Sequence, residues 1–551
     1  TVAAPRPAPA APTAAPAPAQ PPTPTPAARA PALTPAPAGA APRRGGTLSV
    51  LKFQDATHWD AHRSPPIVGL WDFLSETLVN FDGKDGRPVP QLVESWEYPN
   101  DRTLVLHVRK GVRFVNQPPV NGREFTADDV VWNLDRIRRP GATYLWRDNL
   151  LAVSSITATD KYMVKLDLKY PFAPMLAYLR GNTSTTQPMY AKEVEEKLGE
   201  EAYKDMNNAR GVGAFMVKDY NPSAQATLVR NPDYYRQGMP YIDAIRVSFL
   251  SDQVTMAAAL RTGRGDMLVG GLADFLTADL KNDIERTNKV ITWSSTPDAF
   301  IVGLVPNLQR KPFDDIRLRK AIFLAMDRQE TLKVILGAGG HISGPLSWKL
   351  FPGWTWSEQD LLKREGYRQP KDPDIAEAQR LMKELGYGPD KLLEIQAEGT
   401  TFVPWLNITP MEVAKSQLRK IWINITIKVE DGAQYLANDP KGDFLFRSRG
   451  YTTPPEVDAQ LYTRHHTGAG RNFQKLSDDA LDKLLDTQRQ ELDVTKRRQL
   501  ILQAQEKLWS LYPATWLFTR EAFIPRQPWV KGPDFTAWRF WGEPAELWLD
   551  R

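Results

Sequence analysis

Few residues in this 551-residue chain are spaced as catalytic, metal-binding or phosphate-binding residues are. Each of those few also has a simple structural explanation. His465 and His466 are adjacent, so their rings project differently and cannot form the i, i+4 pair that binds a metal from one helix face. The carboxylate pairs at 314–315 and 478–479 stand where helices are expected to begin, and helix capping explains them. The glycine-rich stretch 337–340 follows a predicted helix rather than a strand, so we expect it to end that helix rather than cradle a phosphate.

The common catalytic motifs are missing from the sequence. It contains no G-x-x-x-x-G-K-[ST] loop, no G-x-S-x-G elbow and no H-E-x-x-H pair. A glycoside hydrolase would need two carboxylates facing one cleft, and no spacing points to such a pair. We therefore predict no catalytic residue, no metal site and no cofactor, with an extracytoplasmic glycoside hydrolase as a distant alternative.

Tryptophan is the other chemical feature, with 17 in the chain. Trp132, Trp509 and Trp516 have helical or buried contexts and are expected in cores. Loop tryptophans suit a ligand cleft, because their flat apolar faces stack on side chains or sugar rings, although packing on the protein surface is an open alternative for each. The tryptophans in predicted loops are Trp59, Trp146, Trp348, Trp354, Trp356 and Trp405.

Composition is that of an ordinary globular protein, with 42% hydrophobic and 25% charged residues. The net charge is +5 and basic residues are interspersed with acidic ones, which excludes a nucleic-acid footprint. No apolar run approaches the ~18 residues of a membrane span. The absence of cysteine excludes disulfides and thiolate chemistry. The length predicts two or three domains.

The elements that must position any site are clearest between residues 103 and 137. Leu104, Leu106 and Val108 alternate with more polar neighbours, which predicts a half-buried strand. Thr126 is a natural N-cap for a helix whose buried face repeats at 130, 134 and 137. Strands and helices alternate irregularly along the chain, so the fold class is predicted as α/β with mixed sheets.

Similar patterns predict the remaining elements. Strands are expected at 47–53, 214–220, 226–230, 244–250 and 424–429. Helices are expected at 70–79, 253–262, 315–326, 328–336, 375–385, 412–420, 478–490 and 494–511.

Several short sequence motifs occur along the chain in a characteristic order. They are GGTL at 45–48, LVESWE at 92–97, DRTLVLHVRKGVRFV at 101–115, FTADDV at 125–130, GVGAF at 211–215, NPDYY at 231–235, PYID at 240–243, LRTGRGD at 260–266, PFDDIRLRKA at 312–321 and MDR at 326–328. These motifs and their order resemble those of the family 5 solute-binding proteins of bacterial ABC importers, which take up oligopeptides, dipeptides and nickel chelates. The resemblance covers nearly the whole chain after residue 45.

The resemblance implies a two-lobed periplasmic-binding-protein fold, type II-like with an extra subdomain, and a ligand cleft between lobes joined by a hinge. Lobe I would comprise residues 45–78, 186–299 and 520–551. A subdomain at 79–185 would be inserted in lobe I, and lobe II would span 300–519. The strands that cross between the lobes would lie near Ala299–Pro306 and Phe518–Ile524.

The resemblance also implies which segments line the cleft: 57–63, 178–182, 447–454 and 468–473. Peptide binders of the family pair the ligand's α-amine with an aspartate that follows a glycine, but here Tyr451 follows Gly450. A free peptide N-terminus is therefore not expected to be anchored by this loop. With two loop tryptophans added, the predicted ligand-binding residues are Trp59, Arg63, Trp146, Arg180, Asn182, Trp405, Arg449, Tyr451, Arg471 and Asn472.

Residues 1–44 are almost entirely Ala, Pro and Thr and are predicted to be a disordered, extended tether. Many members of the family are lipoproteins held by an N-terminal cysteine, and this segment resembles such a spacer with its lipidated cysteine missing. The alternative is a low-complexity tail with no such role. We expect an extracytoplasmic protein, periplasmic or at the cell surface, that touches the membrane only through a lipid anchor.

The functional expectation is an extracytoplasmic solute-binding protein, not an enzyme, that delivers its ligand to the permease subunits of an ABC importer. A peptide or peptide-like ligand comes first because most of the family binds peptides. An oligosaccharide is the alternative suggested by the loop tryptophans, and a nickel chelate or another anionic small molecule is the alternative suggested by the arginines. We expect a monomer that binds no nucleic acid.

Overall fold

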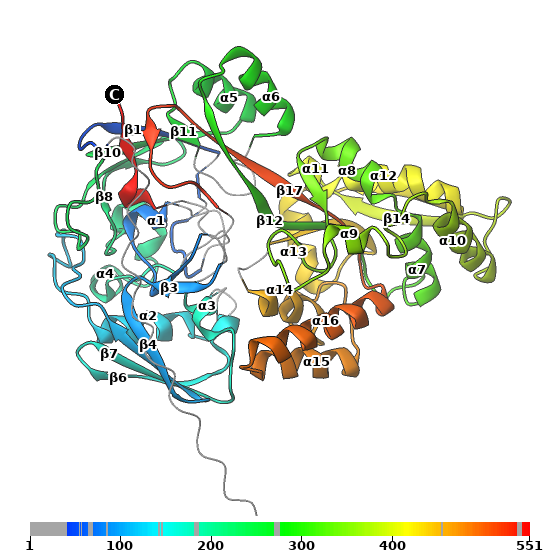
Figure 1. The fold of residues 1–551 in the computed structure, drawn as a ribbon, viewed down its shortest axis with the longest axis horizontal. Coiled ribbons are helices and arrows are strands. Elements are labelled where there is room, and N and C mark those ends of the chain that lie inside the picture. The colour runs from blue at the N-terminus through cyan, green and yellow to red at the C-terminus, as the bar shows by residue number, and fades with distance from the viewer. Residues whose placement is uncertain are drawn as a thin grey trace, which may run out of the picture.

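Two long antiparallel strands, β12 (Thr292–Pro306) and β17 (Thr515–Arg526), join two lobes of mixed helices and strands (Figure 1). This is a computed structural model. It describes residues 41–53, 55–56, 58–63, 70–83, 86–140, 144, 147–180, 187–268, 276–452, 456–536 and 543–551. At 148, 299, 451 and 452 the backbone is described but the side chain is not.

The first lobe, at the left of Figure 1, contains the chain up to β12 and the segment after β17. Its strands are β1 (Thr47–Phe53), β2 (Val79–Phe81), β3 (Pro88–Pro90), β4 (Val93–Asn100), β5 (Thr103–Val108), β6 (Val153–Asp160), β7 (Met163–Leu168), β8 (Phe215–Asn221), β9 (Gln225–Arg230), β10 (Ala244–Leu250), β11 (Met267–Leu268), β18 (Val530–Lys531) and β19 (Trp548–Leu549). Its helices are α1 (Trp71–Leu74), α2 (Ala127–Ile137), α3 (Met175–Arg180), α4 (Lys192–Leu198), α5 (Gln253–Arg261) and α6 (Ala278–Thr287).

The second lobe, at the right of Figure 1, lies between the two joining strands in sequence. Its strands are β13 (Gly340–Ile342), β14 (Leu393–Gly399), β15 (Ile423–Val429) and β16 (Phe446–Thr452). Its helices are α7 (Ile316–Ala325), α8 (Arg328–Leu336), α9 (Glu358–Leu361), α10 (Asp372–Glu384), α11 (Pro404–Asn407), α12 (Thr409–Leu418), α13 (Gly432–Lys441), α14 (Val457–His465), α15 (Asp479–Gln490) and α16 (Val494–Leu511).

One mixed sheet runs through both lobes in the order β15-β14-β16-β12-β17-β11-β1-β10-β9-β8, with β13 also paired to β17. The pairs β1–β10 and β14–β15 are parallel, whereas β12 is antiparallel to both β16 and β17. A separate antiparallel sheet, β4-β5-β7-β6, lies in the first lobe. The two-lobed α/β architecture expected from the sequence is confirmed.

Local sequence signals explain the best-predicted elements. Thr126 and Asp129 form a capping box at the start of α2, satisfying backbone N–H groups that the helix leaves free. The side chains of Val130, Leu134 and Ile137 are fully buried. In β5, the alternation around Leu104 and Leu106 is observed, and Val105 is also mostly buried because both faces of this strand are covered.

The predicted helix at 70–79 is wrong, because α1 ends at Leu74 and β2 begins at Val79. Tertiary hydrogen bonds replace the helical ones there: Gly213 N–H donates to the Leu74 carbonyl, and Met189 N–H donates to the Glu76 carbonyl. Long-range partners have therefore overridden the local apolar period.

Apolar packing falls into separate clusters. The largest lies in the first lobe around Leu48, Phe73 and Val247, and a smaller one there contains α5 and α6. Two clusters fill the second lobe, one beside α16 and one beside α12. The domain boundaries expected from the sequence remain a proposal, and the predicted tether lies mostly outside the described residues. Among the helices that are described, none combines the length and apolar composition that a membrane crossing requires.

Candidate functional site

The strands that join the lobes carry a break in their pairing. Pro297 pairs with Glu521 and Ile301 pairs with Thr519, so three residues of β12 lie opposite Arg520 alone. Asp298 lies within this break, and the Arg520 guanidinium binds its Oδ2 through Nη2 at 2.9 Å. Both side chains are almost fully buried. The junction therefore has extra backbone on one strand and a buried ion pair across it.

Trp405, a predicted ligand residue on α11, borders this ion pair. The Arg520 guanidinium lies 4.4 Å from the centre of the Trp405 indole ring. Trp405 is half-buried and packs beside the α12 cluster of the second lobe. An arginine stacked on one face of a tryptophan holds that ring in place, and it adds an attraction between the cation and the ring.

The neighbouring residue of β17 belongs to a second polar network. Glu521 pairs with Lys349, and its Oε1 lies 3.5 Å from His341 Nδ1. Burial alone would raise the pKa of Glu521, but His341 and Lys349 stabilise the carboxylate and bring its pKa down to about 2. On the other side of the imidazole, His341 Nε2 lies 3.0 Å from Ser347 Oγ.

Ser347, His341 and Glu521 thus follow the order of a charge relay, but the geometry does not suit catalysis. The Ser347 side chain is fully buried, and a nucleophile must reach its substrate. The network joins β13 to β17 and so helps to fix the second lobe to this joining strand.

In the second lobe, two arginines of β16 form ion pairs with one aspartate of α13. Arg449 Nη2 lies 2.7 Å from Asp439 Oδ2, and Arg447 Nη1 lies 3.1 Å from Asp439 Oδ1. Burial raises the pKa of Asp439, although both arginines oppose that rise. The Arg449 guanidinium also lies 5.7 Å from the centre of the Phe473 ring. The cation expected at Arg449 is therefore present, but its charge is shared with Asp439.

In the first lobe, Arg180 ends α3 beside a small polar cavity. The cavity measures about 30 Å³, enough for a water molecule. Glu76 lies in its wall and accepts hydrogen bonds from the hydroxyls of Tyr234 and Tyr235. Burial raises the pKa of Glu76 above its ordinary value despite these donors. The cavity is also lined by Tyr234 and by Asp72, Ser75, Thr77, Asn80, Gln91, Ala214, Glu543, Pro544 and Ala545.

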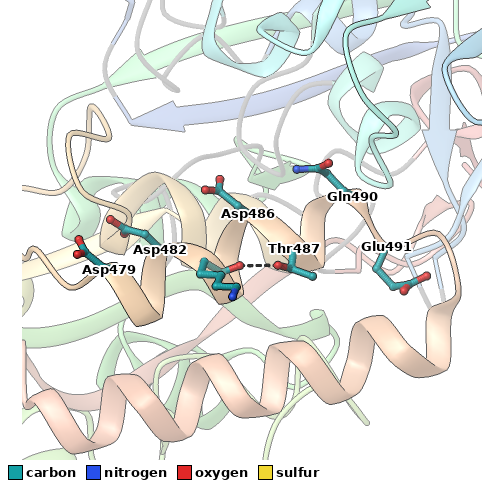
Figure 2. A pocket seen from close by; sticks show the side chains of 7 residues that line it. Asp479, Asp482, Asp486, Thr487, Gln490 and Glu491 are labelled. Carbon is teal, nitrogen blue, oxygen red and sulfur yellow. Dashed lines mark hydrogen bonds between the residues drawn. The ribbon is translucent and has the colours of Figure 1, made fainter.

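A much larger hollow, of about 540 Å³, lies along α15 (Figure 2). It is lined by Asp479, Asp482, Lys483, Asp486, Thr487, Gln490 and Glu491. Asp482 accepts a hydrogen bond from Thr467 N–H, and Asp486 lies 3.5 Å from His466 Nε2. None of the predicted ligand residues lines it, and the acidic side chains alone do not make a site.

The predicted ligand residues that the structure describes lie in several different parts of the molecule. Trp59 lies in the core of the first lobe, 1% exposed, and its Nε1–H donates to the Tyr220 hydroxyl. Arg63 pairs with Glu201 at the surface of the same lobe. Asn472 holds a turn, since its Nδ2 donates to the carbonyls of His466 and Leu476. Arg471 precedes it in that turn, and its backbone N–H donates to the Thr463 carbonyl.

Three of the predicted ligand residues have side chains outside the described part of the structure. Trp146 and Asn182 lie outside the described residues, and for Tyr451 only the backbone is described, paired with Ile301 in the sheet. Among residues that the structure does place, the assignment of Trp59, Arg63, Arg180, Trp405, Arg449, Arg471 and Asn472 to a ligand site remains a proposal.

Sequence reasoning missed Asp298, which pairs with Arg520, and Asp439, which pairs with Arg447 and Arg449. Asp298 stands in a strand and Asp439 in a helix, where neither has a motif to mark it. The same is true of Asp458 on α14, which accepts a hydrogen bond from Tyr178 of the first lobe. The partners of Asp298 and Asp458 lie 222 and 280 positions away, whereas Asp439 precedes Arg447 by 8 positions. In each case the fold brings the groups together.

A family model described as "Bacterial extracellular solute-binding proteins, family 5 Middle" matches residues 87–472. Di/tripeptide-binding protein 3 of Pseudomonas aeruginosa is 27% identical over 473 residues, covering 80% of this chain and 83% of the relative. Among solved structures, the periplasmic binding protein DppA from Helicobacter pylori in complex with the peptide STSA has a TM-score of 0.76 at 24% identity, covering 92% of this chain and 99% of that one. NikZ from Campylobacter jejuni in complex with Ni(L-His) has a TM-score of 0.74 at 16% identity, covering 88% and 95%. These two structures support the fold.

Proposed function

The chain belongs to the bacterial extracellular solute-binding proteins of family 5, and from this premise we propose that it captures a peptide or peptide-like ligand and delivers it to an ABC importer. The observation that carries the proposal is the match of the family model across residues 87–472. The relative with 27% identity over most of the chain is a di/tripeptide-binding protein, which favours a short peptide.

The geometry supports ligand capture between the lobes. In the described sheet, β12 and β17 join the lobes, and their pairing is interrupted at Asp298. A two-stranded junction with a break in its ladder allows one lobe to rotate against the other with little loss of hydrogen bonding. A ligand that contacts both lobes shifts the population toward the closed form.

The role proposed is binding without turnover. The described part of the chain offers one arrangement that resembles a catalytic relay, and its serine is buried. Within that part, no group of three or more His, Cys, Asp or Glu side chains is placed to hold a metal ion. We further propose a monomer outside the cytoplasm, with residues 1–44 as a spacer toward a lipid anchor.

Native mass spectrometry of freshly purified protein tests the ligand class directly, because an enclosed ligand stays bound and its mass identifies it. In parallel, thermal unfolding should be followed with a dipeptide, a tripeptide, Ni(L-His) and a disaccharide. A ligand that binds only the folded state at 100 times its Kd adds about 2.7 kcal/mol to the free energy of unfolding. We expect the peptides to raise Tm. A rise with Ni(L-His) or the sugar alone would overturn the peptide assignment.

A further inference from the structure

A buried hydrogen bond joins the two lobes through residues that are not part of the joining strands. The Tyr178 hydroxyl, on α3 of the first lobe, donates to Asp458 Oδ2, on α14 of the second lobe, at 2.8 Å. Tyr178 is 2% exposed and Asp458 is fully buried. Water is excluded from both groups, and a hydrogen bond to a charged acceptor is stronger in such surroundings than at the surface.

Arg489 of α15 reinforces this contact in three ways. Its Nη2 lies 2.9 Å from Asp458 Oδ2, and its backbone carbonyl accepts a hydrogen bond of 2.9 Å from Ala173 N–H of the first lobe. Its guanidinium lies 3.5 Å from the ring centre of Tyr462 in its own lobe and 4.9 Å from that of Phe172 in the first lobe. One side chain therefore links the aspartate to rings of both lobes.

Apolar contacts surround the polar centre. Phe81 and Ala177 of the first lobe pack in the same cluster as Val457 and Leu461 of α14. In the opposite direction, Ala459 of α14 packs in the main cluster of the first lobe. A polar centre inside an apolar rim resembles the energetic centre of a protein–protein interface, where the rim excludes water.

The second lobe holds its half of the contact in place by itself. Gln488 donates to Asp458, and Arg497 binds Glu456 at 2.6 Å. The Glu456 carboxylate in turn accepts from Asp458 N–H at the start of α14. These bonds lie within one lobe and persist when the lobes separate. Opening then breaks the bonds to Tyr178 and Ala173, which are the described hydrogen bonds of this contact that cross between the lobes, and the contacts around them.

We propose that Tyr178, Asp458 and Arg489 form a latch that holds the lobes closed through protein contacts alone, so that the free protein already populates the closed form. The latch rests on the proposed function, since it regulates the ligand site of that function, and its three residues lie outside the joining strands. The apparent affinity for a ligand that needs the closed form scales with the fraction of protein in that form. A weaker latch therefore weakens ligand binding.

The test measures the closed fraction without any ligand, so its result does not depend on the peptide assignment. The chain has no cysteine, which permits specific spin labelling. Leu198 in the first lobe and Val494 in the second are both 55% exposed and suit substitution to cysteine. Full-length protein, unfolded in denaturant and refolded to remove bound molecules, is then measured by double electron–electron resonance.

Tyr178→Phe keeps the ring and removes the donor. We expect two inter-label distances in the wild type, and a closed-to-open ratio that is at least about tenfold lower in this variant, which corresponds to about 1.4 kcal/mol. Tyr162→Phe is the matched control, because the Tyr162 hydroxyl donates to Glu124 Oε1 at 2.8 Å within the first lobe. Its distance distribution should equal that of the wild type.

Asp458→Asn is a second variant for the same distance measurement and should also favour the open form. Near-ultraviolet circular dichroism confirms that it is folded. If this variant does not fold, Tyr178→Phe decides alone. Equal distributions for the wild type and Tyr178→Phe would overturn the latch. A wild type without a short-distance population would overturn it as well.

Discussion

Asp298 and Arg520 face each other across the break in the β12–β17 ladder and are joined there by an ion pair of 2.9 Å. The pair lies where three residues of one strand oppose one residue of the other, which is where the backbone of the junction is least constrained. A buried and well-directed ion pair restricts the angles that such a break can adopt.

Removal of one partner of this pair should be costly. In Asp298→Ala, the Arg520 guanidinium would be left buried without its carboxylate, so the free energy of unfolding should fall by about 3–5 kcal/mol. Urea denaturation measures the change. Asp534→Ala is a suitable control, because Asp534 pairs with Arg526 of the same strand but is largely exposed, and its loss should cost about 1 kcal/mol or less. Equal losses in the two variants would contradict the role of the buried pair.

Acid should destabilise the protein through two buried histidines. His62 Nε2 lies 3.0 Å from the Pro188 carbonyl and its Nδ1 lies 3.1 Å from Arg136 Nη1, so the neutral ring donates on one side and accepts on the other. Burial, and then the charge of Arg136, lower the pKa of His62 from 6.5 to about 3. Burial, and then Arg464, lower the pKa of His465 to about 3 as well.

Because both folded pKa values lie below 6.5, the unfolded chain takes up these protons first. The contribution to stability is complete above about pH 6.5 and is lost as the pH falls toward 3, by up to about 1.4 kcal/mol per pH unit for each histidine. Urea midpoints at pH 7 and pH 4.5 measure this loss. His62→Gln and His465→Gln should each reduce the pH dependence, and the double variant should reduce it most. An unchanged dependence in all three variants would refute this explanation.

Capping the N-terminus of a bound peptide should cost little affinity. The buried carboxylates described at the joining strands, on α13 and at the latch already have cationic partners. Asp298, Asp439, Asp458 and Glu456 pair with arginines, and Glu521 pairs with Lys349. Loss of a buried charge pair costs about 2–5 kcal/mol, which is roughly 30-fold or more in Kd. We expect acetylation of a binding peptide to change Kd by less than tenfold in isothermal titration calorimetry. A hundredfold loss would show that a carboxylate elsewhere in the protein binds the α-amine.

Deletion of residues 1–40 should leave the two lobes intact. The composition of this segment cannot build a core, and the described chain is fixed shortly afterwards by the Gly45 N–H bond to the Tyr241 carbonyl. We expect the shortened protein to keep its Tm and ligand affinity in calorimetry. A fall of several degrees would assign this segment a structural role instead of the proposed tether.

The sequence predicted well whatever depends on local signals. The N-cap at Thr126 and the buried period of α2 can be read directly, and β1, β5, β8, β9, β10 and β15 were found from the residue pattern. It failed where distant contacts decide. The helix expected through Glu76 stops because Gly213 and Met189 bond to that segment. Trp59 lies in a loop, as expected, yet the fold covers it completely.

The candidate site was harder to predict for the same reason. Arg449 could be picked out through a family resemblance, but nothing near it in sequence announces that Asp439 compensates its charge. The bond between Tyr178 and Asp458 spans 280 positions of the chain, and each residue alone has an unremarkable context. Pairing between lobes is a property of the tertiary structure.

A single sheet runs through both lobes, so the lobes are connected by strands that resist twisting. Neighbouring strands in a sheet are rotated by roughly 20–25° to each other, and β12 and β17 carry this twist from one lobe to the other. Any rotation of the lobes must wind or unwind that pair, so the junction has a resting angle and a restoring torque on either side of it. We therefore expect the junction to oppose rotation of the lobes in either direction, in addition to the contacts that each lobe makes with a ligand.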